Sequence, residues 1–245
     1  IELWLTEDGI TKKIVFSGDV GNTNQPIIKD PAPVAETDYL VLESTYGSRN
    51  HERHTDTIEV LAELIENTLS RGGNVVIPSF AIGRPQELLY AIREIKQRKL
   101  VKNMDFPVYV DSPLAIEATE IFSKCDPACF DDETRKLIDD GIDPIRFDGL
   151  RLSVTVEDSK RINETLEPKV ILSASGMCEA GRIRHHLKHN LWRPQNLILF
   201  VGYQAEGTLG RNLIEGVQNV RLFGEDITVR AQIKSLKGTS GHADQ

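Results

Sequence analysis

Short apolar runs alternate along this chain with polar, glycine-bearing loops and helix-like segments. The runs lie at residues 14–16, 39–42, 75–77, 108–110, 170–172 and 197–201. Unbroken apolar strands separated by helices are typical of a mostly parallel sheet that is covered on both faces. We therefore predict an α/β fold built on a parallel sheet.

Polar side chains follow these runs, where the predicted strands end. They include Asp19, Glu43, Ser79, Ser175 and Tyr203. In parallel α/β sheets, ligands bind at the carboxyl ends of the strands. The pattern therefore predicts a binding site at that edge of the sheet.

Local signals also predict where helices and turns begin and end. Thr55 or Asp56 can cap a helix that runs to about Ser70 and stops at Gly72-Gly73. Further signals are Pro85 and Pro113 in first turns, Gly141 closing an acidic helix from Asp131, and a hairpin of residues 220–223 and 227–233 around residues 224–226.

Two acids stand out among the strand-end residues. Asp19 lies in a turn between Gly18 and Gly21, which lets the backbone bend tightly and leaves the carboxylate at the sheet edge. Glu43 repeats the arrangement after the next run. The pair favours a site, although each acid could instead accept hydrogen bonds from nearby backbone amides.

Three motifs in order resemble those of the β-CASP family of metallo-β-lactamase-fold ribonucleases: Ser17-Gly18-Asp19, Glu43-Ser44-Thr45-Tyr46-Gly47 and Ser240-Gly241-His242-Ala243-Asp244. Segments 78–84, 175–177 and 202–208, which lie between them, also resemble this family. It includes bacterial and archaeal RNA nucleases and the eukaryotic endonuclease subunit that cleaves pre-mRNA 3′ ends. The resemblance covers essentially the whole chain.

The resemblance implies a division of labour at the site. Asp19 corresponds to the aspartate that bridges two metal ions, usually zinc. His242 corresponds to the histidine that protonates the leaving ribose oxygen, and Glu43 to the acid that orients it. This fits the physics, because histidine titrates near neutrality and a carboxylate partner fixes its tautomer and favours its protonated form.

The family's His-x-His-x-Asp-His cluster and its later motif C histidine are absent from this sequence. The histidines are His51, His54, His185, His186, His189 and His242. One bridging carboxylate without histidine partners cannot hold a metal pair tightly. We therefore expect the full-length protein to be a nuclease with two zinc ions, and this chain alone to be inactive and not to retain them. His185 and His189, four residues apart, could share a metal only with further ligands.

Candidate RNA contacts follow several predicted strands. Ser79 and Arg84 could hold a backbone phosphate, or Arg84 could instead pair with Glu87. Tyr203 could stack on a base or pack between domains.

The segment from Arg182 to Arg193 holds four cations, three histidines and no acid. It follows the Ser175-Gly176 loop, so the start of its helix could face a phosphate. The RNA contacts predicted here are Ser175, Gly176, Arg182, Arg184 and His186. The alternative is a basic helix face exposed to solvent.

Composition limits the choice of function. Hydrophobic residues make up 40% and charged residues 27% of the 245 residues, which indicates a globular protein with a core. The net charge of −8 argues against wholesale non-specific binding to nucleic acid, but not against a local basic groove. Three cysteines form no disulfide framework, so we expect a reducing cytoplasm. No apolar run is long enough to span a membrane.

The resemblance implies a Rossmann-like β-CASP domain at residues 48–238. Residues 1–47 and 239–245 would be pieces of a metallo-β-lactamase αββα domain. The expected partner is single-stranded RNA, without membrane association, and a homodimer is left open. The alternatives are a catalytically silent RNA-processing subunit and a DNA nuclease of the same superfamily. A nucleotide-binding Rossmann enzyme is disfavoured, since no Gly-x-Gly-x-x-Gly turn follows any predicted strand.

Overall fold

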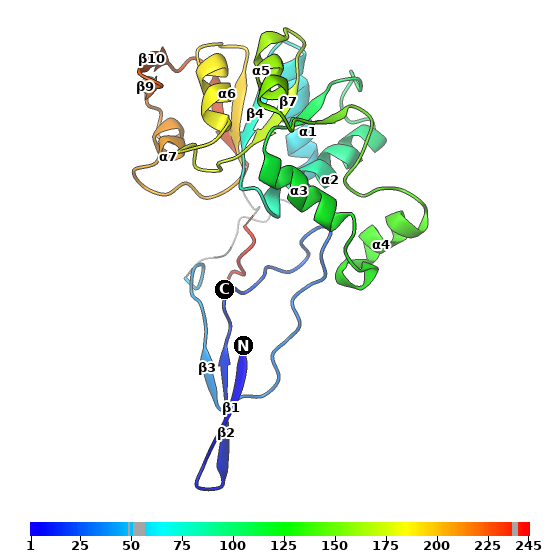
Figure 1. Cartoon of the computed structure of the whole chain (residues 1–245), viewed down its shortest axis with the longest axis vertical. Coiled ribbons are helices and arrows are strands. Elements are labelled where there is room, and N and C mark those ends of the chain that lie inside the picture. Colours follow the sequence, from blue (N-terminus) through cyan, green and yellow to red (C-terminus); the bar gives the residue numbers. More distant parts are fainter. Residues whose placement is uncertain (49, 51–56, 237–239) are drawn as a thin grey trace.

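The computed structural model of the chain describes residues 1–48, 50, 57–236 and 240–245. Its main body contains a six-stranded sheet in the order β11-β8-β4-β7-β5-β6, with every neighbouring pair parallel (Figure 1). The strands are β4 (Val75–Pro78), β5 (Val108–Val110), β6 (Leu150–Leu152), β7 (Val170–Ser173), β8 (Leu197–Phe200) and β11 (Gln232–Ser235). The predicted α/β fold with a parallel sheet is confirmed.

Helices cover both faces of this sheet, which explains why its strands are apolar throughout. Val75 and Ile77 of β4 join one core cluster, whereas Val76 joins the other. The first cluster includes side chains of α1 (Thr57–Leu69), α2 (Arg84–Gln97) and α3 (Pro113–Phe122); the second includes α5 (Val156–Glu164), α6 (Ile183–Asn190) and α7 (Leu209–Ile214). None of the helices in the described ranges is long and apolar enough to cross a membrane.

A second, smaller sheet projects from the body as a narrow arm (Figure 1). It consists of β1 (Glu2–Glu7), β2 (Ile10–Phe16) and β3 (Tyr39–Val41), with β1 antiparallel and β3 parallel to β2. The apolar runs at residues 14–16 and 39–42 therefore do not belong to the main sheet. The domain borders at 47/48 and 238/239 stay predictions.

The local signals mark most element ends correctly. Pro85 and Pro113 lie in the first turns of α2 and α3, and Gly141, with φ of 74°, follows α4 (Asp132–Asp139) and its cap Asp131. The short helix η1 (Pro127–Cys129) precedes α4. The proposed caps Thr55 and Asp56 lie outside the described residues, as do His51 and His54.

The hairpin prediction needs correction. β9 (Asn219–Leu222) pairs with β10 (Glu225–Thr228), so the turn is Phe223-Gly224 rather than residues 224–226. Both turn residues have positive φ, 51° and 84°. Residues 227–233 do not form one strand, because β11 begins at Gln232 and joins the main sheet beside β8.

The turn after α1 yields a test of the packing. A Cβ on Gly73 would lie 1.9 Å from the carbonyl oxygen of Gln195, whereas a Cβ on Gly72 would meet nothing within 4 Å. Gly73→Ala should lower the free energy of unfolding by about 3 kcal/mol, because backbone must move. Gly72→Asn should cost less than about 1 kcal/mol, since asparagine tolerates the positive φ. Urea denaturation of both variants measures the difference, and equal losses would contradict this packing.

Candidate functional site

Three side chains with metal-ligand chemistry converge where the arm meets the body. Donor atoms of Asp19, Glu43 and His242 all lie within 4.8 Å of one another. Asp19 follows β2, Glu43 follows β3, and His242 comes from the far end of the chain. The three motif residues selected from the sequence are therefore neighbours in space.

Backbone pairing between remote segments holds the cluster together. Gly21 and His242 form an antiparallel bridge, and the Ala243 N–H donates to the Val20 carbonyl at 2.8 Å. The Val20 N–H in turn donates to the Glu43 carboxylate. The imidazole and its partner acid are thus fixed by main chain as well as by their own contact.

The surroundings of Glu43 favour its ionised form. Its side chain accepts hydrogen bonds from Thr45 Oγ1, from His242 and from the Val20 N–H, and these lower its pKa to about 2. His242 Nδ1 lies 3.1 Å from both carboxylate oxygens. A carboxylate facing Nδ1 keeps a proton on that nitrogen and sets the orientation of the ring. The Tyr46 ring lies beside it, with ring centroids 6.4 Å apart.

The donor set of this cluster fits part of a metal site. Two carboxylates and one imidazole suit zinc or manganese, but Glu43 and His242 already face each other through Nδ1. The exposed Asp19 carboxylate is therefore the best-placed ligand. His185 and His189 belong to no group of three close donors within the part of the chain that the structure describes.

Sequence comparisons relate this chain to known proteins. The family described as the Beta-Casp domain matches residues 85–213. The chain belongs to the β-CASP family. It is 38% identical over 242 residues to Ribonuclease TTHA0252 of Thermus thermophilus, covering 99% of this chain and 55% of that protein.

Two archaeal relatives widen the β-CASP comparison. The chain is 34% identical to the RNase J-like protein of Methanocaldococcus jannaschii, with 99% of this chain and 55% of the relative covered. It is 33% identical to Transcription termination factor FttA of Thermococcus kodakarensis, with 84% and 32% covered. The chain thus spans about half the length, or less, of these relatives.

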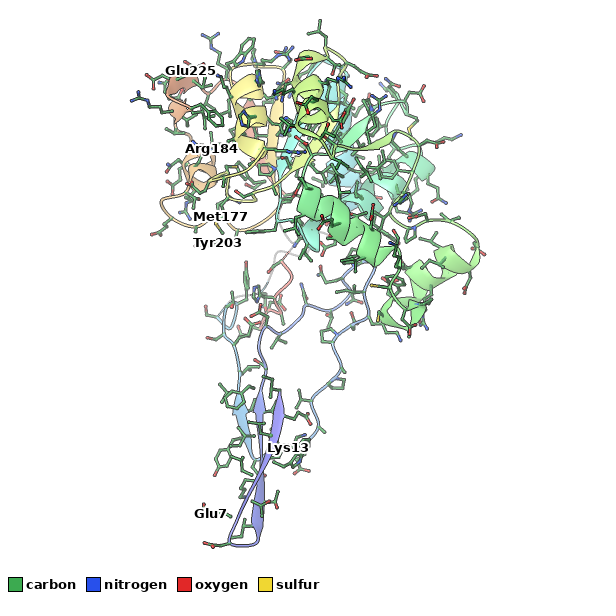
Figure 2. The ribbon with its side chains drawn as sticks, viewed as in Figure 1. Glu7, Lys13, Met177, Arg184, Tyr203 and Glu225 are labelled. Atoms are coloured by element: carbon green, nitrogen blue, oxygen red, sulfur yellow. The ribbon has the colours of Figure 1, made fainter. Side chains whose placement is uncertain are left out.

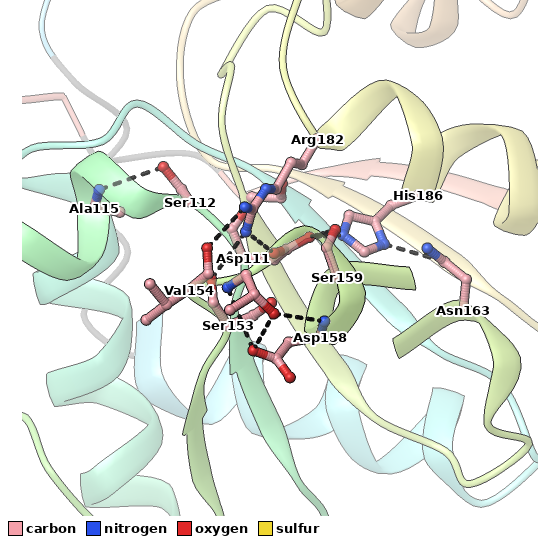
Figure 3. A network of polar contacts seen from close by, with 12 residues as sticks. Asp111, Ser112, Ala115, Ser153, Val154, Asp158, Ser159, Asn163, Arg182 and His186 are labelled. Carbon is pink, nitrogen blue, oxygen red and sulfur yellow. Dashed lines mark hydrogen bonds and ion pairs between the residues drawn. The ribbon is translucent and has the colours of Figure 1, made fainter. Parts of the chain in front are cut away.

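A buried carboxylate organises the carboxyl edge of the β-CASP sheet (Figure 3). Asp111, directly after β5, is fully buried. One carboxylate oxygen accepts from Arg182 Nη1 at 2.8 Å, and the other lies 2.6 Å from both His186 Nε2 and Ser159 Oγ. Arg182 also donates to the carbonyl of Val154 at 2.9 Å. These bonds join three segments that lie far apart in the sequence.

The Asp111 network changes the interpretation of two predicted RNA contacts, His186 and Arg182. His186 is fully buried, and Asn163 occupies its other ring nitrogen at 3.1 Å, so the imidazole has no exposed atom to offer RNA. The Arg182 guanidinium donates hydrogen bonds to Asp111 and to backbone carbonyls. We therefore correct His186 to a positioning residue. Arg182 also holds the loop before α6, and whether it contacts RNA stays a prediction.

Asp111 itself was not singled out from the sequence. It follows the apolar run 108–110, as the chosen strand-end residues follow theirs. The available signal was the acid-free stretch from Arg182 to Arg193, which needs a carboxylate from elsewhere if any of it is buried.

Of the other predicted RNA contacts, Arg84 and Ser79 bond to other residues of the chain, whereas Tyr203 is exposed. Arg84 pairs with Glu87, which was the alternative. Ser79 is buried and its N–H donates to Ser173. Tyr203 is 61% exposed, so it does not fill a seam in this chain.

Ser175 and Gly176 lie in the loop between β7 and α6, as predicted. Ser175 Oγ accepts from the Ala180 N–H at 3.3 Å, which closes that loop. Arg184 lies over the Phe223 ring at 5.2 Å and donates weakly to the Glu179 carbonyl. Whether Ser175, Gly176 and Arg184 contact RNA stays a prediction.

The network predicts a pH dependence of stability. Burial alone would raise the pKa of Asp111, but the hydrogen bonds from His186 and Ser159 and the nearby charge lower it to about 2. Since the unfolded value is near 4, the carboxylate contributes stability above that pH and loses it as the pH falls toward 2. Asp111→Asn should cost about 3 kcal/mol at neutral pH, and this cost should shrink by about 2 kcal/mol at acid pH.

Urea denaturation between pH 7 and pH 2.5 measures that difference for the unchanged chain and the variant. Asp226→Asn, an exposed position in β10, is the matched control and should leave stability nearly unchanged. A constant cost of Asp111→Asn across this range would show that the carboxylate is not stabilised by these partners.

Proposed function

We propose that this chain is the substrate-holding part, with a share of the catalytic site, of a metal-dependent ribonuclease. The observation that carries the proposal is the contact between Glu43 and His242, which are 199 positions apart and meet with Nδ1 against the carboxylate. Relatives that are named a ribonuclease and an RNase J-like protein support the assignment.

The proposed chemistry is hydrolysis of an RNA phosphodiester. His242 protonates the leaving ribose oxygen, and the ionised Glu43 faces its Nδ1 and holds the ring in place. Asp19 would hold metal at the same site. Two zinc ions, when bound, would supply an activated water and stabilise charge on the phosphate. Because the remaining ligands are not in this sequence, we expect the chain alone to be inactive and to hold zinc poorly.

The natural substrate we propose is single-stranded RNA, processed in the cytoplasm without membrane association. A catalytically silent subunit would have no need of the arranged Glu43–His242 pair, which favours the enzyme. The DNA nuclease alternative differs only in substrate. Competition of labelled RNA by unlabelled DNA of equal length separates the two.

Replacement of the histidine tests the mechanism. In the full-length protein, His242→Ala should slow RNA cleavage by about 100- to 10,000-fold, because a general acid is lost. Binding measured by fluorescence anisotropy in the presence of a chelator should stay near normal. Glu43→Gln should slow cleavage less and alter the pH dependence of kcat, since the acid acts through the imidazole.

Equal loss of binding and cleavage in His242→Ala would reject the general-acid role. Cleavage that persists after exhaustive chelation would reject metal dependence. Full-length protein that cleaves no RNA under any condition would favour the silent subunit.

A further inference from the structure

Two aromatic rings stand exposed at the carboxyl ends of adjacent strands. Phe80 follows β4 and is 53% exposed, and Tyr203 follows β8 and is 61% exposed. β4 and β8 are neighbours in the sheet, and Ile82, also largely exposed, lies beside Phe80 in sequence. Figure 2 shows Tyr203 and Met177 on the side of the body that faces the arm. Exposed aromatic faces at the strand ends, where parallel sheets bind ligands, are suited to stacking on a planar ring of a ligand.

The two loops that carry the rings both contact the loop that contains Gly176. A Cβ on Gly176 would come within 3.1 Å of both the ring and the backbone nitrogen of Phe80, so the loop after β7 packs directly against this residue. The buried Gln204, next to Tyr203, donates to the Gly176 carbonyl at 3.0 Å. The same side chain abuts Gly210, where a Cβ would lie 1.8 Å from its amide oxygen. Gly176 thus lies between the two loops that carry the rings.

The length of the connecting chain limits the distance between these loops and the candidate catalytic cluster. The Leu236 N–H donates a hydrogen bond to the carbonyl of Phe200, the last residue of β8, at 2.8 Å. Tyr203 is three residues beyond Phe200, which limits it to about 10 Å from that point. His242 is six residues beyond Leu236, which limits it to about 20 Å. A short single strand can therefore reach both.

The cations of this edge are largely neutralised. Arg84 pairs with Glu87, and Arg182 pairs with Asp111. Phosphate binding would have to compete with these carboxylates, and it would leave a buried acid without its partner at Asp111. The exposed rings face no such competition.

We propose that Phe80 and Tyr203 form a base-stacking platform, which holds the unpaired bases of the RNA strand while its phosphate reaches the catalytic cluster. The proposal rests on the proposed function and names the chemistry of its substrate grip: π-faces of bases rather than phosphates. Each stacked base should strengthen binding about 5- to 150-fold. Because every base has a π-face, the platform tolerates any sequence but requires an unpaired strand.

The test uses an RNA oligonucleotide that carries 2-aminopurine, whose fluorescence is quenched on stacking. The 245-residue chain should quench it, and Phe80→Leu or Tyr203→Ala should each weaken binding at least 5-fold and reduce the quenching. Phe80→Tyr should restore both, since it keeps a ring. Trp192→Ala is the matched control, because Trp192 is 53% exposed but follows the C-terminal end of α6, away from the carboxyl edge.

A second set of binding measurements uses an RNA in which three adjacent nucleotides are replaced by abasic residues, which keep every phosphate. Binding to the unchanged chain should fall sharply, and Tyr203→Ala should then have no further effect. Unaltered affinity for the abasic strand, or unaltered quenching in both ring variants, would overturn the platform. No binding of any oligonucleotide by the chain would also overturn it. Cleavage by full-length protein that depends on His242 but not on Phe80 or Tyr203 would reject the platform and leave the proposed function standing.

Discussion

The arrangement of the carboxyl edge depends on the fully buried carboxylate of Asp111. Removing a charge from water costs several kcal/mol, and the cost is offset only when hydrogen bonds and opposite charge surround the ion. Arg182, His186 and Ser159 supply these from two helices and a loop. Satisfying the carboxylate therefore requires the loop before α6 to close over the end of β5. These contacts therefore also help to position Gly176, which lies in that loop.

The candidate site formed by Asp19, Glu43 and His242 depends on different contacts. Its three side chains come from both ends of the chain, and the pairing of Gly21 with His242 brings those ends together. Glu43 is ionised because Thr45, His242 and the Val20 N–H all favour its charged form. The cluster thus depends on backbone pairing for its geometry and on local donors for its charge. Its members lie in other segments of the chain than Asp111, Ser159, Arg182 and His186, so damage to one group need not abolish the other.

More of the fold than of the candidate site could be predicted from the sequence. Four strands of the main sheet were predictable because both of their faces are covered, which leaves runs such as Val75–Pro78 without alternation. β6 and β11 were not predicted, since they are short and not fully buried and carry polar residues among the apolar ones. The arm was harder to separate, since its runs look the same locally. The Arg84–Glu87 pair was foreseeable from its spacing of three. The Asp111 network was not, because its members are up to 75 positions apart and nothing local pairs them.

The same network explains why a count of basic residues misjudges this surface. The segment from Arg182 to Arg193 holds four cations and no acid, and in isolation it resembles a phosphate-binding helix. In the folded chain, Arg182 is held by Asp111, and Lys188 pairs with Glu225 of β10. Pairing of this kind fits a net charge of −8, in which acids outnumber bases. What the carboxyl edge presents to a ligand is then set by its exposed rings. On the proposed stacking platform, this edge would select strands by whether their bases are unpaired, which charge alone would not achieve.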